Sequence, residues 1–519
     1  MWLILLAIFL CAFTYFWISK TSKPAKLPPG PPRYPIVGSA FSMKPPNSSR
    51  PELFWAIRDL KEKYGSIFSL YLGNTTAVVF TELEDIKDIF GREETANRPP
   101  IPGFRVRPGW DTPCKIDPEL NAMSPPGVIF SNGHYWKDHR RFLLKNLRDF
   151  GFGKTSMEEA IGEEVQKLMV KLKASEGKPI GLNRTFNISI LNALWNILAG
   201  EKLELDDPKL LSLLKCLDDL VKTIEGPAGL LSSMLPFESM AYWPIIKQII
   251  HMDTLQAVIE GLMSLIRPNI AFHQDNLDEN VANDFIDVML NEIARTTDPN
   301  SSFYGECGKF ALINILIDLF IAGTETTSSS LLWSVLFLLH HPECQFKIQR
   351  EIDEVIGQIR LPMLDDKSSL HYTSAFLQES LRFASFVPMS VFHYSSKDIE
   401  YKGYSIPKGS MLLSSLYHVM YNPEFFPEPE VFKPERFIDA NGHFMPDDRV
   451  VAFGLGKRVC LGKTLAEKEF FLFFAALLQN YEFKSAPGEK LPPIDIESLP
   501  VVGLIRAIPD YKVVYKKRY

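Results

Sequence analysis

Cysteine is scarce in this sequence, and no two cysteines lie at metal-ligand spacing. Six are scattered over 519 residues, and none belongs to a Cys-x-x-Cys motif. This distribution excludes a zinc-ribbon site and argues against a disulfide framework. The folded part is therefore expected in a reducing compartment.

A strong charge imbalance and the common nucleotide and hydrolase motifs are also missing. The formal net charge is −6, so the global charge does not indicate a nucleic-acid partner. No glycine-rich dinucleotide or flavin fingerprint follows a predicted strand. No Gly-x-Ser-x-Gly elbow occurs with a suitable triad, which argues against a hydrolase. Any electrons that the chain uses must therefore come from another protein.

The N-terminus carries an uncharged run over residues 2–18 that would span roughly 25 Å as a helix. A cleaved signal peptide is the rival interpretation, but no basic segment precedes the run and no clear cleavage site follows it. Basic residues after the run place the remainder in the cytosol by the positive-inside rule: Lys20, Lys23, Lys26 and Arg33. We expect a signal-anchor transmembrane helix over residues 1–20 and a basic, proline-rich linker over 21–33. Under that topology the five Asn-x-Ser/Thr sequons, at 47, 74, 183, 187 and 300, are chance matches.

The most informative stretch, residues 453–462, reads Phe-Gly-Leu-Gly-Lys-Arg-Val-Cys-Leu-Gly. An apolar, proline-free segment follows, and its periodicity places Cys460 at a helix N-terminus. The amides and dipole there favour a thiolate, the form that ligates metals or attacks carbon. Gly456 and Gly462 allow close backbone approach, and Arg458 suits a carboxylate. A buried structural cysteine between two turn glycines is the plainer alternative.

A long helix is predicted over residues 307–341, which contain no proline. Its first half is apolar enough for a membrane span, but Asp318 and the polar run at 323–330 interrupt it. Residues 322–327, Ala-Gly-Thr-Glu-Thr-Thr, are poor helix formers and favour a local opening of the helix. A hydroxyl at Thr326 beside the Glu325 carboxylate can hold water and relay protons. The alternative is simply a polar face on a buried helix.

Residues 453–462 resemble the haem-binding loop of the cytochrome P450 monooxygenases at every fixed position, and other motifs of that family occur in order upstream. They are Trp-x-x-x-Arg at 136–140, Ala-Gly-Thr-Glu-Thr-Thr at 322–327, Glu-Ser-Leu-Arg at 379–382 and Pro-Glu-Arg-Phe at 434–437. Trp136 and Arg140 share one helix face; the alternative is a basic surface helix, and both interpretations can hold because two faces can serve two partners. The stretch 140–154 looks especially similar to the microsomal drug- and steroid-metabolising group. The resemblance covers residues 28–512.

The resemblance assigns roles around a haem. It implies that Cys460 is the proximal thiolate ligand of the iron, which favours O–O cleavage, and that Phe453 shields the sulfur. Arg458, Trp136 and Arg140 would pair with the haem propionates. His393 is a further candidate, because it lies where the family often has an arginine or a histidine. On the other haem face Glu325 and Thr326 would manage protons. Room for dioxygen there would come from Ala322 and Gly323.

The implied fold is mainly α with small peripheral β-sheets. Length alone predicts about three domains of roughly 150 residues. The expected haem contacts, however, come from residues 136 to 460, which favours one haem-thiolate catalytic domain over 34–519. The resemblance also implies a buried structural network of Glu379, Arg382 and Arg436. Segments 97–130, 386–392 and 500–505 would surround the substrate, and 226–237 is read as either a core-packed connection or a mobile lid.

The implied function is NADPH-driven insertion of one atom of O₂ into a lipophilic molecule such as a xenobiotic, fatty acid, steroid or terpenoid. Electrons would come from NADPH–cytochrome P450 reductase, with cytochrome b5 as a second donor, at the endoplasmic reticulum membrane. These partners would dock on a basic face formed by Lys137, Arg140, Arg141, Lys145, Arg148, Lys457, Arg458 and Lys463. A haem-thiolate isomerase or dehydratase acting on peroxides, and a non-catalytic haem-binding protein, are the alternatives. Neither would need Glu325 and Thr326.

Overall fold

The computed structural model describes Trp17 and residues 24–35, 37–42, 53–99, 107–109, 126–149, 155–203, 208, 210–211, 214–215, 243–495, 501–502, 505–506 and 508–519. The expected anchor over 1–20 lies outside these ranges apart from Trp17. The segment 226–237 and residues 500, 503 and 504 lie outside them as well. Only parts of the expected pocket roof, 97–99, 107–109 and 126–130, are described.

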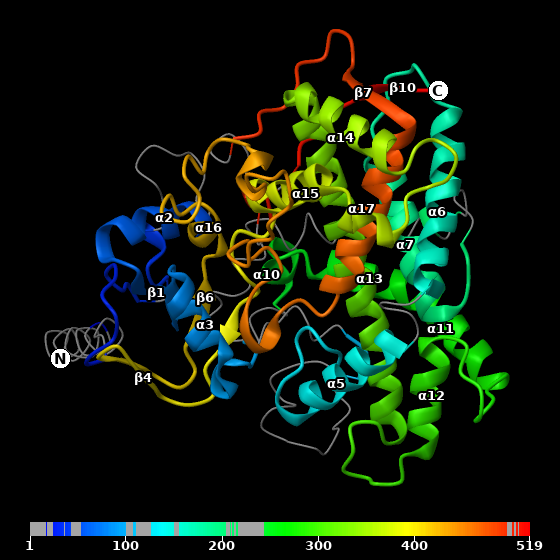
Figure 1. Ribbon diagram of the computed structural model, residues 1–519. Coiled ribbons are helices and arrows are strands. Elements are labelled where there is room, and N and C mark those ends of the chain that lie inside the picture. The colour runs from blue at the N-terminus through cyan, green and yellow to red at the C-terminus, as the bar shows by residue number, and fades with distance from the viewer. Residues whose placement is uncertain are drawn as a thin grey trace, which may run out of the picture.

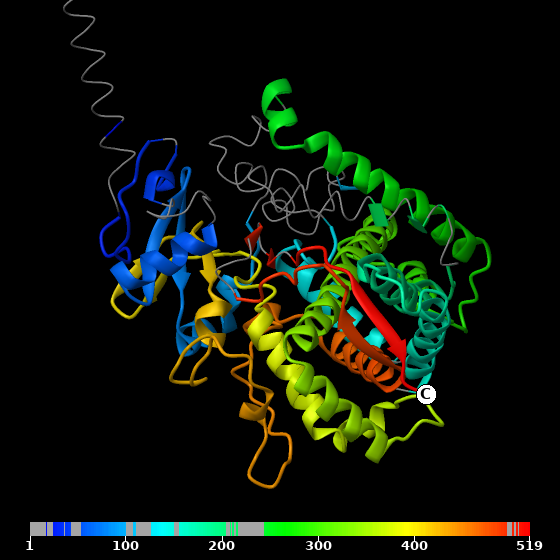
Figure 2. The ribbon, with the colours of Figure 1, turned by 90° about the horizontal axis from the view of Figure 1, so that it is seen from above.

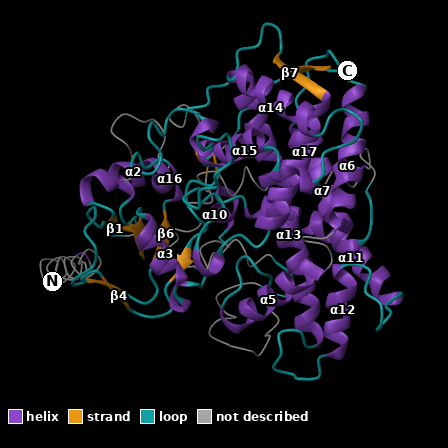
Figure 3. Ribbon diagram, viewed as in Figure 1, coloured by secondary structure: helices purple, strands orange, loops and turns teal. Residues whose placement is uncertain are grey.

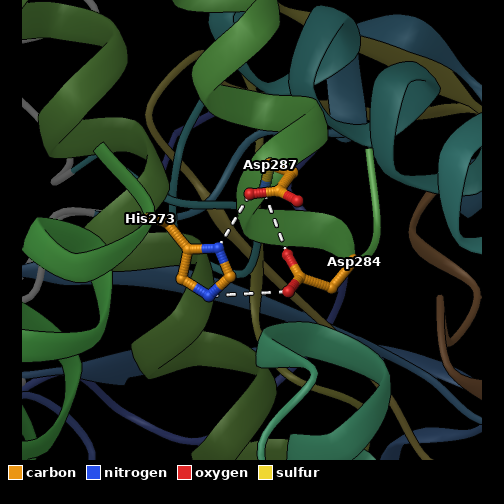
Figure 4. A group of neighbouring side chains, drawn as sticks. All are labelled: His273, Asp284 and Asp287. Carbon is orange, nitrogen blue, oxygen red and sulfur yellow. Dashed lines mark hydrogen bonds and ion pairs between the residues drawn. The ribbon is translucent and has the colours of Figure 1, made fainter. Parts of the chain in front are cut away.

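Helices form the larger part of the protein, as predicted, and occupy the right side of Figure 1 (see also Figure 3). They are α5 (Gly133–Asp149), α6 (Thr155–Lys173), α7 (Asn183–Ala199), α10 (Pro244–Ile249), α11 (Met252–Asp275), α12 (Phe285–Arg295), α13 (Gly305–His340), α14 (Pro342–Val355), α15 (His371–Ala384) and α17 (Lys463–Asn480). Figure 2 shows α11 along the outside of this part, with α10 at its end.

The long helix α13 runs through the centre of the helical part and packs against α7, α12, α15 and α17. A helix that is apolar on most of its faces is stable in water only when other elements surround it. Among the described residues α13 is also the one helix long and apolar enough to cross a membrane, although much of it is buried inside the protein. We therefore describe it as the core helix.

The expected local opening of this helix at residues 322–327 is not observed, because α13 is helical from Gly305 to His340. The hydroxyl groups bond back to the helix instead. Thr324 Oγ1 donates to the carbonyl of Phe320 at 3.0 Å, and Ser330 Oγ donates to the carbonyl of Thr326 at 2.9 Å. Such bonds let hydroxyl residues remain within a regular helix.

A smaller part with a four-stranded sheet lies on the left of Figure 1, with α2 (Leu53–Tyr64), α3 (Leu83–Gly91) and α16 (Leu416–Met420) beside it. The strand order is β1 (Ile67–Leu72), β2 (Thr75–Phe80), β6 (Met411–Ser414) and β3 (His393–Tyr394). The predicted turn between the first two strands contains Gly73 at φ 58°. Strand β6 runs parallel to β2, so the chain returns to this sheet after the helical part.

The described residues also form three two-stranded sheets. They pair β4 (Ile399–Tyr401) with β5 (Tyr404–Ile406), β7 (Tyr481–Ser485) with β10 (Val513–Lys517), and β8 (Val501–Val502) with β9 (Ile505–Arg506), all antiparallel. The prediction of a mainly α protein with small β-sheets is thus confirmed.

The predicted ionic network of Glu379, Arg382 and Arg436 is present and buried. Glu379 and Arg382, both on α15, are fully inaccessible and form two hydrogen bonds of 2.7 and 2.9 Å. Arg436, from the short 3₁₀ turn Pro434–Phe437, donates to Glu379 at 3.2 Å. Arg382 also donates to the carbonyls of Met420 and Pro429. One carboxylate therefore ties α15 to the irregular segment that precedes the Cys460 loop.

The cysteines depart in one respect from the expectation. Cys344 and Cys460 are free, but Cys307, at the start of α13, is disulfide-bonded. The inference that the sequence has no disulfide framework therefore overlooked a bridge at Cys307. Wide spacing along the chain does not keep two cysteines apart once the chain folds.

Removing the Glu379 carboxylate should destabilise the protein strongly. Glu379→Ala leaves two buried guanidiniums without their anion, and breaking a buried ion pair costs about 3–5 kcal/mol. The measurement is the free energy of unfolding in urea. The matched control is Glu354→Ala, which removes an exposed i,i+4 pair of 3.7 Å with Arg350 and should cost about 0.5 kcal/mol or less. Equal effects of the two substitutions would show that the network has no special structural role.

Candidate active site

A cavity of about 340 Å³ lies between α13 and the segment that carries Cys460. Its walls are mainly apolar. Residues from α13, from the end of α15, from 386–393, from 452–462 and from the first turns of α17 line it. The prediction that 386–392 lines a pocket is confirmed for Phe386, Val387, Ser390 and Val391.

Cys460 lies two residues before Gly462, the residue that caps the N-terminus of α17. Its side chain is surrounded by protein on most sides but is open to the cavity. Burial raises the pKa of the Cys460 thiol, while hydrogen bonds from the amides of Gly462 and Lys463 and the charge of Arg140 oppose that rise. The local structure thus supplies the donors that a thiolate needs.

The loop before Cys460 is held in place by its backbone. The Cys460 amide donates to the carbonyl of Phe453 at 2.9 Å, and Phe453 itself lines the cavity. Gly454 and Gly456 adopt φ values of 75° and 77°. A Cβ at Gly456 would lie 2.0 Å from the carbonyl oxygen of Phe90 in α3. The close approach predicted at Gly456 is therefore to α3, while Gly462 has an ordinary φ and open space around it.

Helix α13 brings Ala322, Gly323 and Thr326 to another wall of the same cavity. Thr326 Oγ1 donates to the carbonyl of Ala322 at 2.7 Å, so its proton is held within the helix while its oxygen remains available as an acceptor. A Cβ at Gly323 would lie 2.7 Å from Leu194 Cδ2 of α7. A side chain at this position would therefore displace the end of the Leu194 side chain.

Glu325 is not among the residues that line the cavity, because it faces α7. Asn187 Nδ2 donates to Glu325 Oε2 at 3.1 Å, and Ser329 Oγ donates to Glu325 Oε1 at 3.3 Å. The two adjacent residues Glu325 and Thr326 therefore lie on different sides of one helix. Sequence adjacency did not reveal this separation.

Three arginines and a histidine gather at one edge of the cavity: Arg98, Arg140, Arg458 and His393. Arg458 donates to the carbonyls of Ala96, Val128, Ile129 and Ser131, and its guanidinium carbon lies 3.8 Å from the centre of the Trp136 ring. Arg98 donates to the carbonyls of Ile129, Val391 and Phe392. Arg140 donates to the carbonyl of Val459. Their hydrogen bonds thus go to uncharged main-chain groups.

The pKa shifts record how much uncompensated positive charge this edge carries. Burial, and then the repulsion of Arg140, lowers the pKa of Arg98 to about 9. Burial, Arg98 and Arg140 lower the pKa of Arg458 well below its ordinary range. Burial, and then the charge of Arg98, also lowers the pKa of His393, although its Nδ1 lies 2.7 Å from the Thr95 carbonyl oxygen. Among the described residues no carboxylate lies within salt-bridge distance of these three arginines.

These features fit the haem that the sequence predicts. Buried arginines without carboxylate partners are stabilised by an anionic group, and a haem carries two propionates. Trp136 Nε1 is buried and has no partner among the described atoms, so it can donate to the same group. A sulfur open to an apolar cavity suits an axial ligand. Cys460, Arg458, Arg140, Trp136 and His393 are thus close enough to hold one group.

Two residues that line the cavity, Arg98 and Asp318, were not predicted from the sequence. Arg98 precedes two prolines in a stretch read only as irregular, and no motif singles it out. Asp318 was read only as an interruption of apolar sequence, yet it lines the cavity, forms a buried ion pair of 2.5 Å with Arg107 and accepts from the amides of Val128 and Ile129. A buried charge within an apolar helix could have indicated such a partner.

Only some residues of the expected basic docking face are exposed. Arg140 and Arg458 point inward to the cavity edge. Lys137 is half-buried and pairs with Glu93, and the Arg148 side chain lies outside the described atoms. The residues of this face that are exposed are Arg141, Lys145, Lys457 and Lys463.

Comparisons with known proteins identify the family of the chain. The Cytochrome P450 family model matches residues 28–514. Cytochrome P450 2L1 of Panulirus argus is 33% identical over 96% of both chains, and Cytochrome P450 2C25 of Mesocricetus auratus is 32% identical over 97% of this chain and 96% of its own. Farnesoate epoxidase of Bombyx mori is 32% identical over 98% of both. The chain therefore belongs to the cytochrome P450 family, the haem-dependent oxidoreductases that act as monooxygenases.

Proposed function

We propose that this protein inserts one atom of O₂ into a lipophilic molecule bound in the cavity between α13 and the Cys460 loop. One observation carries the proposal: Cys460 and Thr326 line the same mainly apolar cavity, whose buried edge carries three arginines. The thiol matches an axial ligand and the hydroxyl matches a proton carrier. The arginines match an anionic cofactor.

In this proposal Cys460 ligates haem iron, and Phe453 shields its sulfur. The propionates are held by Arg458, Arg140, Trp136 and His393, to which we add Arg98. The bound haem supplies oxygen activation, and the thiolate ligand favours cleavage of the O–O bond. The protein supplies position, charge balance and exclusion of water.

Proton management is assigned to Thr326 and Glu325. Thr326 Oγ1 is at the cavity wall, where it can accept a hydrogen bond from water, and its own proton would become available there when the hydroxyl turns away from the Ala322 carbonyl. Glu325 supplies the carboxylate of the relay from the α7 side of the helix. Ala322 and Gly323 leave space on this wall for dioxygen.

Electrons would reach the protein from NADPH through a flavoprotein reductase, with cytochrome b5 as a second donor. The exposed cations Arg141, Lys145, Lys457 and Lys463 support docking of an acidic partner. We place the protein at the endoplasmic reticulum membrane, with residues 1–20 as a single-pass anchor. The linker 21–33 then leads to one cytosolic catalytic domain over 34–519.

The apolar lining and the name of one relative support a lipophilic substrate, such as a terpenoid, steroid, fatty acid or xenobiotic. One relative is named for epoxidation of farnesoate. A panel of such compounds, screened for spectral shifts on binding, selects the substrate for the turnover experiments below.

The first test is the ligation of iron by Cys460. The reduced, CO-bound protein should show the red-shifted Soret band of thiolate ligation, and Cys460→His should replace it with a histidine-type spectrum. Cys344→Ala removes the other free cysteine among the described residues and should leave the band unchanged. A histidine-type spectrum in the unmodified protein would refute the assignment.

The second test is the proton role of Thr326. In Thr326→Ala the share of NADPH electrons released as peroxide or water should rise several-fold, since a positioned proton-transfer group contributes about 10²–10⁴-fold to the step it serves. The measurement is product and peroxide formed per NADPH. Thr324→Ala is the control, because Thr324 makes the same bond to its helix but does not line the cavity. Unchanged coupling in Thr326→Ala would remove this residue from the mechanism.

The third test is electrostatic docking. Reductase-supported turnover should slow as salt shortens the Debye length from about 10 Å at 0.1 M to about 3 Å at 1 M. Lys145→Glu and Lys457→Glu should likewise slow turnover at a given reductase concentration. Lys516→Glu, in β10, is the control. Insensitivity to both salt and charge reversal would contradict docking on this face.

A further inference from the structure

The proposed proton relay leaves one geometric problem, which is the position of Glu325. Thr326 faces the cavity, whereas the Glu325 carboxylate lies between α13 and α7. Something must hold it there in a defined state, because a half-buried carboxylate without donors is costly. The two helices pack lengthwise, and the donor comes from α7.

We infer that Asn187 is a positioning residue that holds Glu325 by hydrogen bonds in both of its protonation states. This inference rests on the proposed role of Glu325. Asn187 is 5% exposed, so its amide is part of the packed helix interface. The same burial makes the sequon at 187 unsuitable for glycosylation.

The amide chemistry allows both states. Asn187 Nδ2 donates to ionised Glu325 Oε2 at 3.1 Å, while Asn187 Oδ1 is buried and has no partner among the described atoms. A half-turn of the amide exchanges its nitrogen and oxygen. Oδ1 would then accept the O–H of protonated Glu325. When Glu325 gives its proton to a water molecule it is left as a carboxylate, and a hydronium ion from the solvent restores the acid.

Ser329 supplies the second donor. Its hydroxyl lies one turn after Glu325 on α13 and donates to Oε1 at 3.3 Å. A hydroxyl can donate or accept, so it too suits either state. Asn187 differs from Ser329 because it lies on another helix and fixes the carboxylate in space rather than along α13.

The chain offers a closely matched control on the same helix. Asn192 of α7 is also buried, also has an Oδ1 without a partner among the described atoms, and donates through Nδ2 to a carboxylate, Glu164 of α6, at 3.4 Å, as well as to the carbonyl of Leu203 at 2.8 Å. Asn187→Asp and Asn192→Asp therefore make the same isosteric change opposite a glutamate. Only the first change affects Glu325.

The test compares product formed per NADPH in Asn187→Asp, Asn192→Asp, Glu325→Gln and Asn187→Asp/Glu325→Gln. Asn187→Asp should lower coupling by about tenfold, the effect expected when one hydrogen bond to a charged group is lost. The double variant should be no worse than Glu325→Gln, because both changes remove the same function. Asn192→Asp should stay near the unmodified protein. Additive losses, or equal losses in the two Asn→Asp variants, would overturn the inference.

A second readout does not involve turnover. In the resting ferric protein, infrared difference spectra between each protein and its Glu325→Gln partner isolate the Glu325 carboxylate band. Asn187→Leu should shift that band, and an unmoved band would overturn the positioning role. If instead Glu325→Gln leaves coupling unchanged while the band shifts, the proposed function of Glu325 fails and its hydrogen bond to Asn187 stands. The two failures are thus distinguishable.

Discussion

The site depends on a guanidinium buried among backbone carbonyls. Arg458 bonds to four of them, in segments near residues 96 and 128–131, and lies over the Trp136 ring. These contacts join the Cys460 loop to α5 and to the segment after α3. They satisfy the donors of Arg458 but do not neutralise its charge. The same interactions that assemble the loop therefore also leave positive charge facing the cavity.

Charge of this kind has a cost unless an anion shares the site. Arg98 and Arg140 add to it, and burial lowers the pKa of each. The Asp318–Arg107 pair lies at the same cavity but is already matched within itself. The cavity thus combines a cationic edge, apolar walls and a sulfur. That combination suits a flat, apolar cofactor with acidic substituents at one edge.

Motifs in the sequence predicted several residues that line this cavity, but neither all of them nor the directions in which all of them point. Cys460, Thr326 and Arg458 were predicted because each lies in a motif of fixed spacing, and all three line the cavity. Glu325 was grouped with Thr326 because they are adjacent, but consecutive residues of a helix point about 100° apart. Arg98 belongs to no motif, and its role arises only from contacts with 129, 391 and 392. The bridge at Cys307 is likewise a matter of long-range proximity.

The close contact at Gly456 links two parts of the fold that the sequence keeps far apart. Because its Cα lies directly on the end of α3, the loop has no side chain through which that distance could be adjusted. Four residues later the backbone reaches Cys460. The position of the sulfur in the cavity therefore depends on α3, beside the sheet, as well as on α17, whereas the hydroxyl on the other wall is placed by the core helix. The distance between the Cys460 sulfur and the Thr326 hydroxyl thus depends on how the sheet part and the helical part pack together.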